Sequence, residues 1–440
     1  MGGHPRGLIV LAATELAERF SYYGMTALLA LYMTKQLLLP EHASDVIGLT
    51  GLRSLMEWRG PISDQAFASL IYGWYGGLVY FTPIVGGLVA DRLLGAKRTV
   101  TLGALLMAGG HIAMSFDASF LGALLLLILG SGLLKGNIAA QVGTLYAPEA
   151  ESERSHGFTI FSTGINIGSV LGPLASGGVA AVYGWHAGFA LAAGVMFVAL
   201  GIYLLGQRYL ADQRPARRDR PQLPALTRDE KVRSWALVAL TAAVVPPIIA
   251  YTMIWNIGII WIDERVALGT PLGAVPASWF NSVDSFASIV VVPPLLALWA
   301  WQARRGREPG GIGKIGLGAA ITGASSMLFV AGEIFAGPDS GVAVWWALAA
   351  YFGMGVAFMW YWPTLLALVS QAAPPKINAT MVSATYLSFF VGSAAMGWVG
   401  SFYGEMGKAA FWTMNAALGF GGALIAWLVR RPLSNRLGTN

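Results

Sequence analysis

Two carboxylates and a guanidinium lie within an apolar stretch near the start of the chain, residues 8–33. They are Glu15, Glu18 and Arg19, and on a helical period they share one face with Tyr22. A charged side chain at the centre of a bilayer costs roughly 2.5–3.5 kcal/mol or more, so these groups must face protein or water. Burial raises the pKa of a carboxyl group and a neighbouring cation lowers it, so a change in either can make the group take up or release a proton near neutral pH. We therefore interpret Glu18, and after it Glu15, as proton carriers. The alternative is a structural ion pair that only fixes helix packing.

A lysine interrupts the apolar run from Leu124 to Gly143. A lysine near the end of a membrane helix can extend its ammonium group to the interface, which is one interpretation of Lys135. Apolar residues flank it on both sides, however, and a central ammonium group would attract a substrate carboxylate or pair with Glu18. Competition between these two partners would couple substrate binding to protonation.

The second half of the chain offers one further carboxylate and a dense group of aromatic residues. Asp284 could bind a substrate ammonium group, serve as a second protonation site, or simply end a helix near the outer surface. Trp255, Trp360 and Tyr361 lie in predicted helices, and residues 358–363 (FMWYWP) are more aromatic than a membrane-interface belt needs. We interpret this run as an apolar wall for bulky side chains of a substrate.

The composition places the chain among polytopic membrane proteins. Of 440 residues, 56% are hydrophobic and 11% are charged, and the mean hydropathy is +0.61. The absence of cysteine and of a His-x-x-x-His pair gives no metal site, and no motif predicts a cofactor. No spacing of a nucleophile and a base predicts an enzyme. We interpret His111 as a satisfied packing histidine, with a place in a proton relay as the alternative. We interpret Glu333 as a solvated residue near an outer helix end.

Twelve segments are long and apolar enough to span a bilayer, since a helical span needs about 20 residues. An even number places both termini on one side. Most of the 28 Lys and Arg residues lie at the termini and in loops after even-numbered segments, so this side is cytoplasmic by the positive-inside rule. The net charge of +6 is therefore a topology signal and argues against nucleic acid as a partner. The segments are 8–34, 64–90, 99–116, 120–146, 154–182, 186–209, 233–262, 277–302, 313–335, 342–372, 378–404 and 408–430.

The longest basic loop, residues 210–232, divides the chain into two bundles of six helices, residues 1–209 and 233–440. Two such bundles with a substrate site between them near the midplane are typical of rocker-type secondary transporters. The first outer loop, about residues 35–63, is long enough to hold a short amphipathic helix or a lid.

The turn after the second segment, residues 86–98, reads GGLVADRLLGAKR. Two glycines allow close helix approach, Asp91 can cap the next helix, and the basic residues suit a lipid surface. An ordinary capped cytoplasmic turn is one interpretation. The spacing also resembles the loop motif of the major facilitator superfamily, which implies that Asp91 and Arg92 help to lock the outward-facing state. Together with the twelve segments, this favours an all-α membrane protein with 12 transmembrane helices, the major facilitator fold and cytoplasmic N and C termini.

Several stretches resemble one branch of that superfamily, the proton-coupled oligopeptide transporters. Residues 15–24 (ELAERFSYYG) are similar to the first-helix signature ExxERFxYYG, and residues 158–168 (FTIFSTGINIG) to the fifth-helix signature FxxFYxxINxG. The resemblance implies that Lys135 binds a peptide carboxylate, that Asn166 hydrogen-bonds a substrate amine, and that the signature tyrosines contribute to the same site. These tyrosines are Tyr22 and Tyr23. The other similar stretches are residues 72–83, 132–137, 276–284 and 294–299.

The chain departs from this family's pattern at positions that bear on the substrate. Many members carry an arginine where this chain has Thr26, and that arginine usually binds the peptide carboxylate together with the fourth-helix lysine. The helix-ten glutamate falls near Phe358, whereas Asp284 stands where the family generally has asparagine. These departures favour a larger, more apolar or modified substrate over free di- and tripeptides.

The predicted function is a proton-coupled symporter that imports short peptides or a peptide-like compound by alternating access. Its expected partners are protons, the lipid bilayer and a small-molecule or peptide substrate, and we expect a monomer in the plasma membrane, a bacterial inner membrane. One alternative is a proton-coupled carrier or exporter of a non-peptide solute in the same fold. Another is a non-transporting membrane receptor or membrane enzyme.

Overall fold

The computed structural model describes residues 4–58, 60–147, 149–211, 225–271, 273–337 and 340–437. This part of the chain is mainly helical, with one short antiparallel hairpin of β1 (Gly269–Thr270) and β2 (Gly273–Ala274). It divides into unit 1, Met1–Ala68 with Leu78–Arg220, and unit 2, Ser69–Gly77 with Pro221–Asn440. Residues 212–224, the greater part of the predicted linker, lie outside the described residues, so the predicted domain limits stay a prediction.

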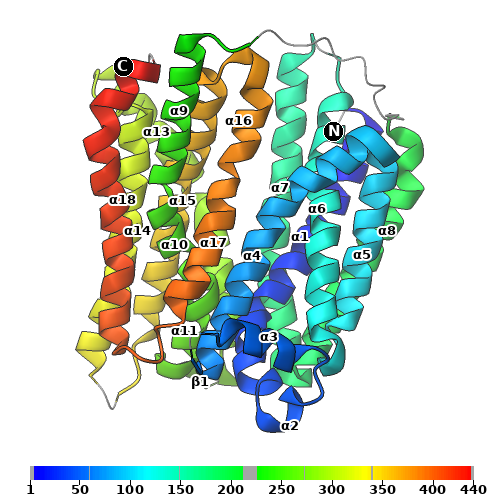
Figure 1. Ribbon diagram of the computed structural model, residues 1–440, viewed down its shortest axis with the longest axis vertical. Helices are drawn as coiled ribbons and strands as arrows, with labels where there is room; N and C mark the ends of the chain where they lie inside the picture. The colour runs from blue at the N-terminus through cyan, green and yellow to red at the C-terminus, as the bar shows by residue number, and fades with distance from the viewer. Residues whose placement is uncertain are drawn as a thin grey trace. The chain divides into compact units, whose positions relative to one another are not determined.

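Unit 1 is built around α1, which packs along α7 and α8, while α5 packs against α6 (Figure 1). Small residues at these crossings let the helix backbones approach closely, which is how helices associate in lipid. Its α-helices are α1 (Arg6–Tyr32), α2 (Pro40–Ala43), α3 (Leu49–Met56), α4 (Asp64–Val89), α5 (Ala96–Ala113), α6 (Phe120–Thr144), α7 (Glu151–Tyr183) and α8 (Trp185–Gly206). Its shorter elements are the π-helices η1 (Met33–Leu37) and η2 (Ala90–Leu94) and the 3₁₀ turns η3 (Asp117–Ser119) and η4 (Gln207–Tyr209).

Unit 2 contains a span that is broken in its middle: α10 passes through the π-helix η5 into α11. A π-turn disturbs the regular hydrogen-bond ladder, and Tyr351 Oη donates a 2.7 Å hydrogen bond to the Ile254 carbonyl at this point. The α-helices of this unit are α9 (Arg228–Ala243), α10 (Val245–Met253), α11 (Ile259–Arg265), α12 (Phe280–Val290), α13 (Val292–Arg304), α14 (Gly311–Ala336), α15 (Val344–Ala372), α16 (Asn378–Thr385), α17 (Leu387–Gly400) and α18 (Lys408–Leu437). The remaining elements are η5 (Ile254–Gly258), η6 (Ala277–Trp279) and η7 (Pro375–Ile377).

The central turns of α4 belong to unit 2 because their side chains are bonded within it. Asn256 Nδ2 donates to Ser69 Oγ over 2.7 Å, and Ser69 Oγ donates to the Gly397 carbonyl over 2.9 Å. This division of one helix between two units is absent from the sequence prediction, since hydropathy reports whether a helix is buried and not what it packs against.

Ten stretches of the described chain are helices long and apolar enough to cross a membrane. The helices α1 and α5 match two predicted segments in position but are not among these ten. Both carry ionisable residues, in the middle of α1 and at the start of α5, which lower their mean hydropathy. The predicted count of twelve spans and the predicted side of the termini therefore remain predictions.

The first predicted outer loop contains the short helix α3, whose one face carries Leu49 in the core. At its C-terminal end Arg53 Nε donates a 2.9 Å hydrogen bond to Glu57 Oε1, and Arg53 Nη1 lies 2.6 Å from Asp64 Oδ1. The hydrogen bond from Arg53 holds the pKa of Glu57 below its ordinary value. Of the two predicted possibilities for this loop, the structure contains the short helix.

The prediction that Asp91 caps the helix after the turn is wrong. The N-cap residue of α5 is Gly95, which has a φ of 77°, and no side chain accepts a hydrogen bond at this helix start. Asp91 and Arg92 lie instead within η2, and both are exposed. The π-helix η2 extends the preceding helix through Leu94, so α5 begins only after Gly95, four residues beyond the aspartate.

Candidate functional site

The ionisable residues of α1 form a buried cluster inside unit 1. Glu15, Glu18 and Arg19 are 3%, 0% and 6% exposed. Arg19 Nε donates a 2.9 Å hydrogen bond to Glu15 Oε1 and lies 2.6 Å from Glu18 Oε2. Glu15 Oε2 has no hydrogen-bond partner in the described chain, and neither has either oxygen of Glu18. One guanidinium therefore serves two carboxylates, and oxygens remain that could take up a proton.

The position of this cluster depends on the close approach of α1 and α7. A Cβ atom added to Gly168 would lie 2.5 Å from the Leu16 carbonyl oxygen and 2.8 Å from Arg19 Cβ. Only glycine fits at such a distance, so Gly168 allows the two helices to meet beside the guanidinium. The last glycine of the INxG stretch thus has a packing role that supports the charged cluster.

Lys135, on α6, joins the same cluster through aromatic rings. Its Nζ lies 4.2 Å from the centre of the Tyr22 ring and 5.4 Å from that of Tyr80, and it interacts electrostatically with Glu15 and Glu18. Such cation–π contacts stabilise an ammonium group that is removed from water. Within the described residues Lys135 makes no ion pair shorter than 4.0 Å, so the predicted direct pairing with Glu18 is not found.

Formal charges in the cluster balance. Two carboxylates face one guanidinium and one ammonium group, so the four side chains sum to zero when all are ionised. Taking this group out of water is tolerable only while this balance holds, because an uncompensated charge in a low-dielectric interior is costly. Any added anion or cation must therefore be matched by a proton or by a counter-charge.

The second candidate cluster lies in unit 2 around Asp284. This side chain is 2% exposed, and Tyr251 Oη donates a 2.9 Å hydrogen bond to its Oδ2. Trp255, one helical turn after Tyr251, also lies beside the carboxylate. A Cβ atom added to Gly355 would lie 2.3 Å from the Asp284 carbonyl oxygen, so α12 and α15 are in close contact here. The interpretation of Asp284 as a helix-end residue at the outer surface is wrong, since it lies buried within α12.

The predicted aromatic wall is divided between two neighbourhoods of unit 2. Phe358 stacks on Tyr251 with ring centres 5.1 Å apart, and Tyr361 meets Phe358 edge-on at 5.8 Å. Trp360, by contrast, packs edge-on against Trp299 of α13 at 5.5 Å. Tyr361 is therefore brought next to the Asp284 cluster, whereas Trp360 faces a different helix. The reason is the helical period, because adjacent residues point about 100° apart around the axis.

Other predicted residues lie around the α1 cluster or at the surface of unit 1. Tyr23 is half-buried, and its ring meets that of Tyr22 edge-on with centres 5.1 Å apart. Asn166 is exposed on α7. Thr26 is buried, and its Oγ1 donates to the Tyr22 carbonyl over 2.9 Å. The hydroxyl that replaces the expected arginine is thus bonded within its own helix.

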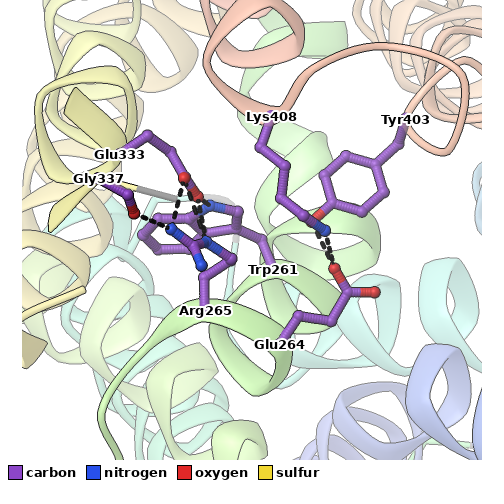
Figure 2. A network of polar contacts seen from close by, with 7 residues as sticks. All are labelled: Trp261, Glu264, Arg265, Glu333, Gly337, Tyr403 and Lys408. Carbon is purple, nitrogen blue, oxygen red and sulfur yellow. Dashed lines mark hydrogen bonds and ion pairs between the residues drawn. The ribbon is translucent and has the colours of Figure 1, made fainter. Parts of the chain in front are cut away.

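Two interpretations of single ionisable residues are wrong. His111 is fully buried in α5, yet neither ring nitrogen has a hydrogen-bond partner in the described chain. Glu333 is not solvated, because its side chain is 10% exposed and its two oxygens accept 3.1 Å hydrogen bonds from Arg265 Nε (Figure 2). Trp261 Nε1 donates a further bond of 2.5 Å to the same carboxylate.

This bonding is part of a network at one end of unit 2 that ties α11 to α14 and to the start of α18 (Figure 2). Arg265 Nη2 also donates to the Gly337 carbonyl over 2.8 Å, and Tyr403 Oη donates to Glu264 Oε2 over 3.0 Å. Lys408 forms an ion pair with Glu264. The network holds the short helix α11, which follows the broken η5 turn, to its neighbours.

Comparisons with known proteins show which family of transporters this chain is similar to. Residues 97–222 match the model of the POT family. A di-/tripeptide transporter of Lactococcus lactis subsp. lactis is 29% identical, with 99% of this chain and 97% of that protein covered. A peptide transporter of Yersinia enterocolitica subsp. palearctica is 26% identical over 90% of this chain and 88% of its own.

Solved structures of POT family transporters are similar to this chain as well. A crystal structure of a peptide transporter POT in complex with sulfate has a TM-score of 0.86 at 25% identity, covering 99% of this chain and 96% of that one. The chain is therefore similar to POT family transporters over nearly its whole length, and residues 97–222 match the family model. It is a multi-pass integral membrane protein, and the proteins to which it is similar are transporters. A second structure, of a POT family transporter in complex with 5-aminolevulinic acid, has a TM-score of 0.84 at 23% identity, covers 99% of this chain and 98% of its own, and shows the shared fold.

Two residues of this chain take part in the clusters although the sequence did not single them out. Tyr251 is the hydrogen-bond donor to Asp284, and Tyr80 forms the second ring beside Lys135. A signal existed for Tyr251, which lies four residues before Trp255 and so shares its face of a helix. Tyr80 lies in a stretch that matched the family, yet nothing in its own neighbourhood relates it to a lysine on another helix.

Proposed function

We propose that this chain belongs to the POT family and is a proton-coupled symporter that imports short peptides or peptide-like compounds by alternating access. The observation that carries the proposal is the charge-balanced cluster of the buried residues Glu15, Glu18 and Arg19 with the half-buried Lys135 in a membrane protein. The substrate class is supported by relatives whose names are di-/tripeptide transporter and peptide transporter. The proposed topology is twelve spans of the major facilitator fold with both termini cytoplasmic, as the basic loops favour.

The charge balance suggests how protons and substrate are coupled. A substrate carboxylate that binds Lys135 brings one negative charge into a cluster that sums to zero. Uptake of one proton by Glu18, or by Glu15, restores the balance, because each has an oxygen without a hydrogen-bond partner in the described chain. A loaded cluster with one proton is then as neutral as the empty one. Both can therefore be carried through the same low-dielectric surroundings, whereas the half-loaded states cannot.

Within unit 2, Asp284 and Tyr251 are proposed to bind an ammonium group of a substrate. A carboxylate that is 2% exposed and bonded to a phenol suits an ammonium group. The neighbouring rings of Phe358 and Tyr361 offer apolar surface for a side chain. A carboxylate, an amine and apolar bulk are the chemical groups that these two clusters would recognise.

The test is uptake by purified protein in liposomes under an imposed pH gradient, alkaline inside. A mixture of di- and tripeptides is added outside, and the trapped compounds are identified by mass spectrometry. We expect accumulation above the external concentration that disappears when a protonophore collapses the gradient, and none in liposomes without protein. Accumulation that survives collapse of the gradient would contradict proton coupling.

A second candidate is a proton-coupled carrier of a non-peptide solute, which specific residues favour. Thr26 has its hydroxyl bonded to the Tyr22 carbonyl, so it offers no cation to a peptide carboxylate. Phe358 stacks on Tyr251 where the family resemblance implies a glutamate. In the same assay, uptake of a modified or non-peptide amino acid compound, with no peptide taken up, would select this candidate.

A further inference from the structure

A recess of about 320 Å³ lies on unit 1 between the start of α5 and the end of α8. Its lining changes in character along α5. Two cationic side chains lie at the start of the helix, a hydroxyl and an amide lie one turn further, and leucines follow. The lining residues are Lys97, Arg98, Thr101, Leu102, Leu105, Leu204 and Gln207.

The charged end of the recess is cationic throughout. Lys97 and Arg98 occupy the first turn of α5, whose free backbone N–H groups add partial positive charge. Close by in the chain, Arg208 lies 4.8 Å from the centre of the Tyr209 ring and Arg6 lies 5.9 Å from the same ring. None of the lining residues in the described chain is acidic. An anionic group would therefore meet cations without an opposing carboxylate.

The middle and the far end of the recess are progressively less polar. Gln207 Nε2 donates a 2.8 Å hydrogen bond to Thr101 Oγ1, which joins the two helices below the cations. Leu102, Leu105 and Leu204 are 38%, 50% and 47% exposed, so much of their hydrocarbon faces outward. From Lys97 to Leu105 the helix rises about 12 Å. The order of cation, hydrogen-bonding group and hydrocarbon is the order of a phospholipid's phosphate, ester groups and acyl chain.

We propose that this recess binds one anionic phospholipid of the surrounding membrane. The phosphate lies against Lys97 and Arg98, the ester oxygens lie near Thr101 and Gln207, and an acyl chain lies along the leucines. Basic recesses between membrane helices bind anionic headgroups in this way. The recess is formed by α5 and α8 and contains none of the residues proposed to bind substrate or protons. This lipid binding is therefore independent of the cargo.

The test is a lipid titration of the delipidated, detergent-purified full chain followed by native mass spectrometry. The probes are dioleoyl phosphatidylglycerol, dioleoyl phosphatidylcholine, glycerophosphoglycerol and inorganic phosphate. We expect one tightly retained phosphatidylglycerol and weaker phosphatidylcholine. Each basic residue near an anionic surface contributes roughly a fivefold effect, so Lys97→Ala with Arg98→Ala should weaken phosphatidylglycerol binding roughly 30-fold.

Matched variants distinguish a built site from general surface charge. The consecutive pair Arg430 and Arg431 at the end of α18 is also basic and exposed, so Arg430→Ala with Arg431→Ala should leave the binding unchanged. Leu105→Ser with Leu204→Ser should weaken lipid binding although the charge is intact. Should Lys97→Ala with Arg98→Ala fail to fold, Lys97→Gln with Arg98→Gln replaces it, and we expect the same loss of phosphatidylglycerol binding.

Three results would overturn the proposal. Equal binding of phosphatidylglycerol and phosphatidylcholine would remove the role of the cations. An equal loss in both basic double variants would show only diffuse surface electrostatics. Binding of glycerophosphoglycerol or inorganic phosphate as tight as that of the lipid would show an anion site to which the leucines contribute nothing.

Discussion

Replacing Glu18 by glutamine should uncouple transport from the proton gradient while leaving the substrate exchange step intact. The amide keeps the size of the side chain but cannot carry the proton, and it leaves the cluster with one surplus positive charge. A substrate carboxylate at Lys135 would itself restore neutrality. Substrate should therefore still bind and exchange in the variant, without a proton to move beside it.

The expected magnitude follows from the gradient and from the geometry of the cluster. Each pH unit corresponds to about 1.4 kcal/mol per proton, so a gradient of about two units supports roughly hundredfold accumulation for one coupled proton. In Glu18→Gln this ratio should fall to about one. Removing one partner of a buried ion pair costs about 3–5 kcal/mol, but Arg19 keeps Glu15 at 2.9 Å. We therefore expect a loss of unfolding free energy of about 1–3 kcal/mol, which a folded variant can tolerate.

The assay is the paired measurement of gradient-driven accumulation and of counterflow in the same proteoliposomes. Glu264→Gln is the control, because it removes a carboxylate from an ion pair with Lys408 in unit 2, where the side chain is 40% exposed. The control should accumulate substrate as the unaltered protein does. Wild-type accumulation by Glu18→Gln would refute the assignment of the proton to Glu18, and folded protein without counterflow would refute the charge argument.

Four further outcomes are expected. Lys135→Ala should weaken binding of peptides with a free carboxylate, measured by competition in the uptake assay, about 10–100-fold, because a hydrogen bond to a charged group contributes about 1.5–3 kcal/mol. Amidated peptides should lose far less, and equal losses would count against a carboxylate role. Asp284→Asn should change the pH dependence or the selectivity of uptake, and no change in either would leave it a structural partner of Tyr251. Glu333→Gln should lower the free energy of unfolding by about 1–3 kcal/mol with uptake retained, and an unchanged thermal unfolding temperature would contradict the network in Figure 2. Gly168→Val should lower the yield of folded protein and its thermal unfolding temperature, and unaltered values would contradict the close approach of α1 and α7.

Several residues were predictable because their signal is local. Glu15, Glu18 and Arg19 stand out in an apolar stretch, and their spacing of three and four residues places them on one helix face without any knowledge of other helices. The structure places all three in one buried cluster. Their proposed role in proton transport is still a prediction, as is that of Asp284.

Other residues could not be placed because their partners lie far away in the sequence. Glu333 looked solvated near a helix end, yet Arg265, 68 residues earlier, bonds it. Lys135 was expected to choose between a substrate and Glu18, and its ammonium group instead lies over Tyr22 and Tyr80. A hydropathy pattern gives the length of a helix but not its rotation about its axis, which selects the neighbours.

By itself the sequence determined that this is a membrane protein of many helices, where most of those helices run, and which α1 side chains had to be shielded from lipid. These follow from the length of apolar runs and from the cost of charge in hydrocarbon, both of which act residue by residue along the chain. The tertiary structure alone decided that Arg265 meets Glu333, that Tyr251 bonds Asp284, and that Trp360 faces Trp299. Those pairings join residues that are far apart in the sequence, and the energy of each depends on both partners at once.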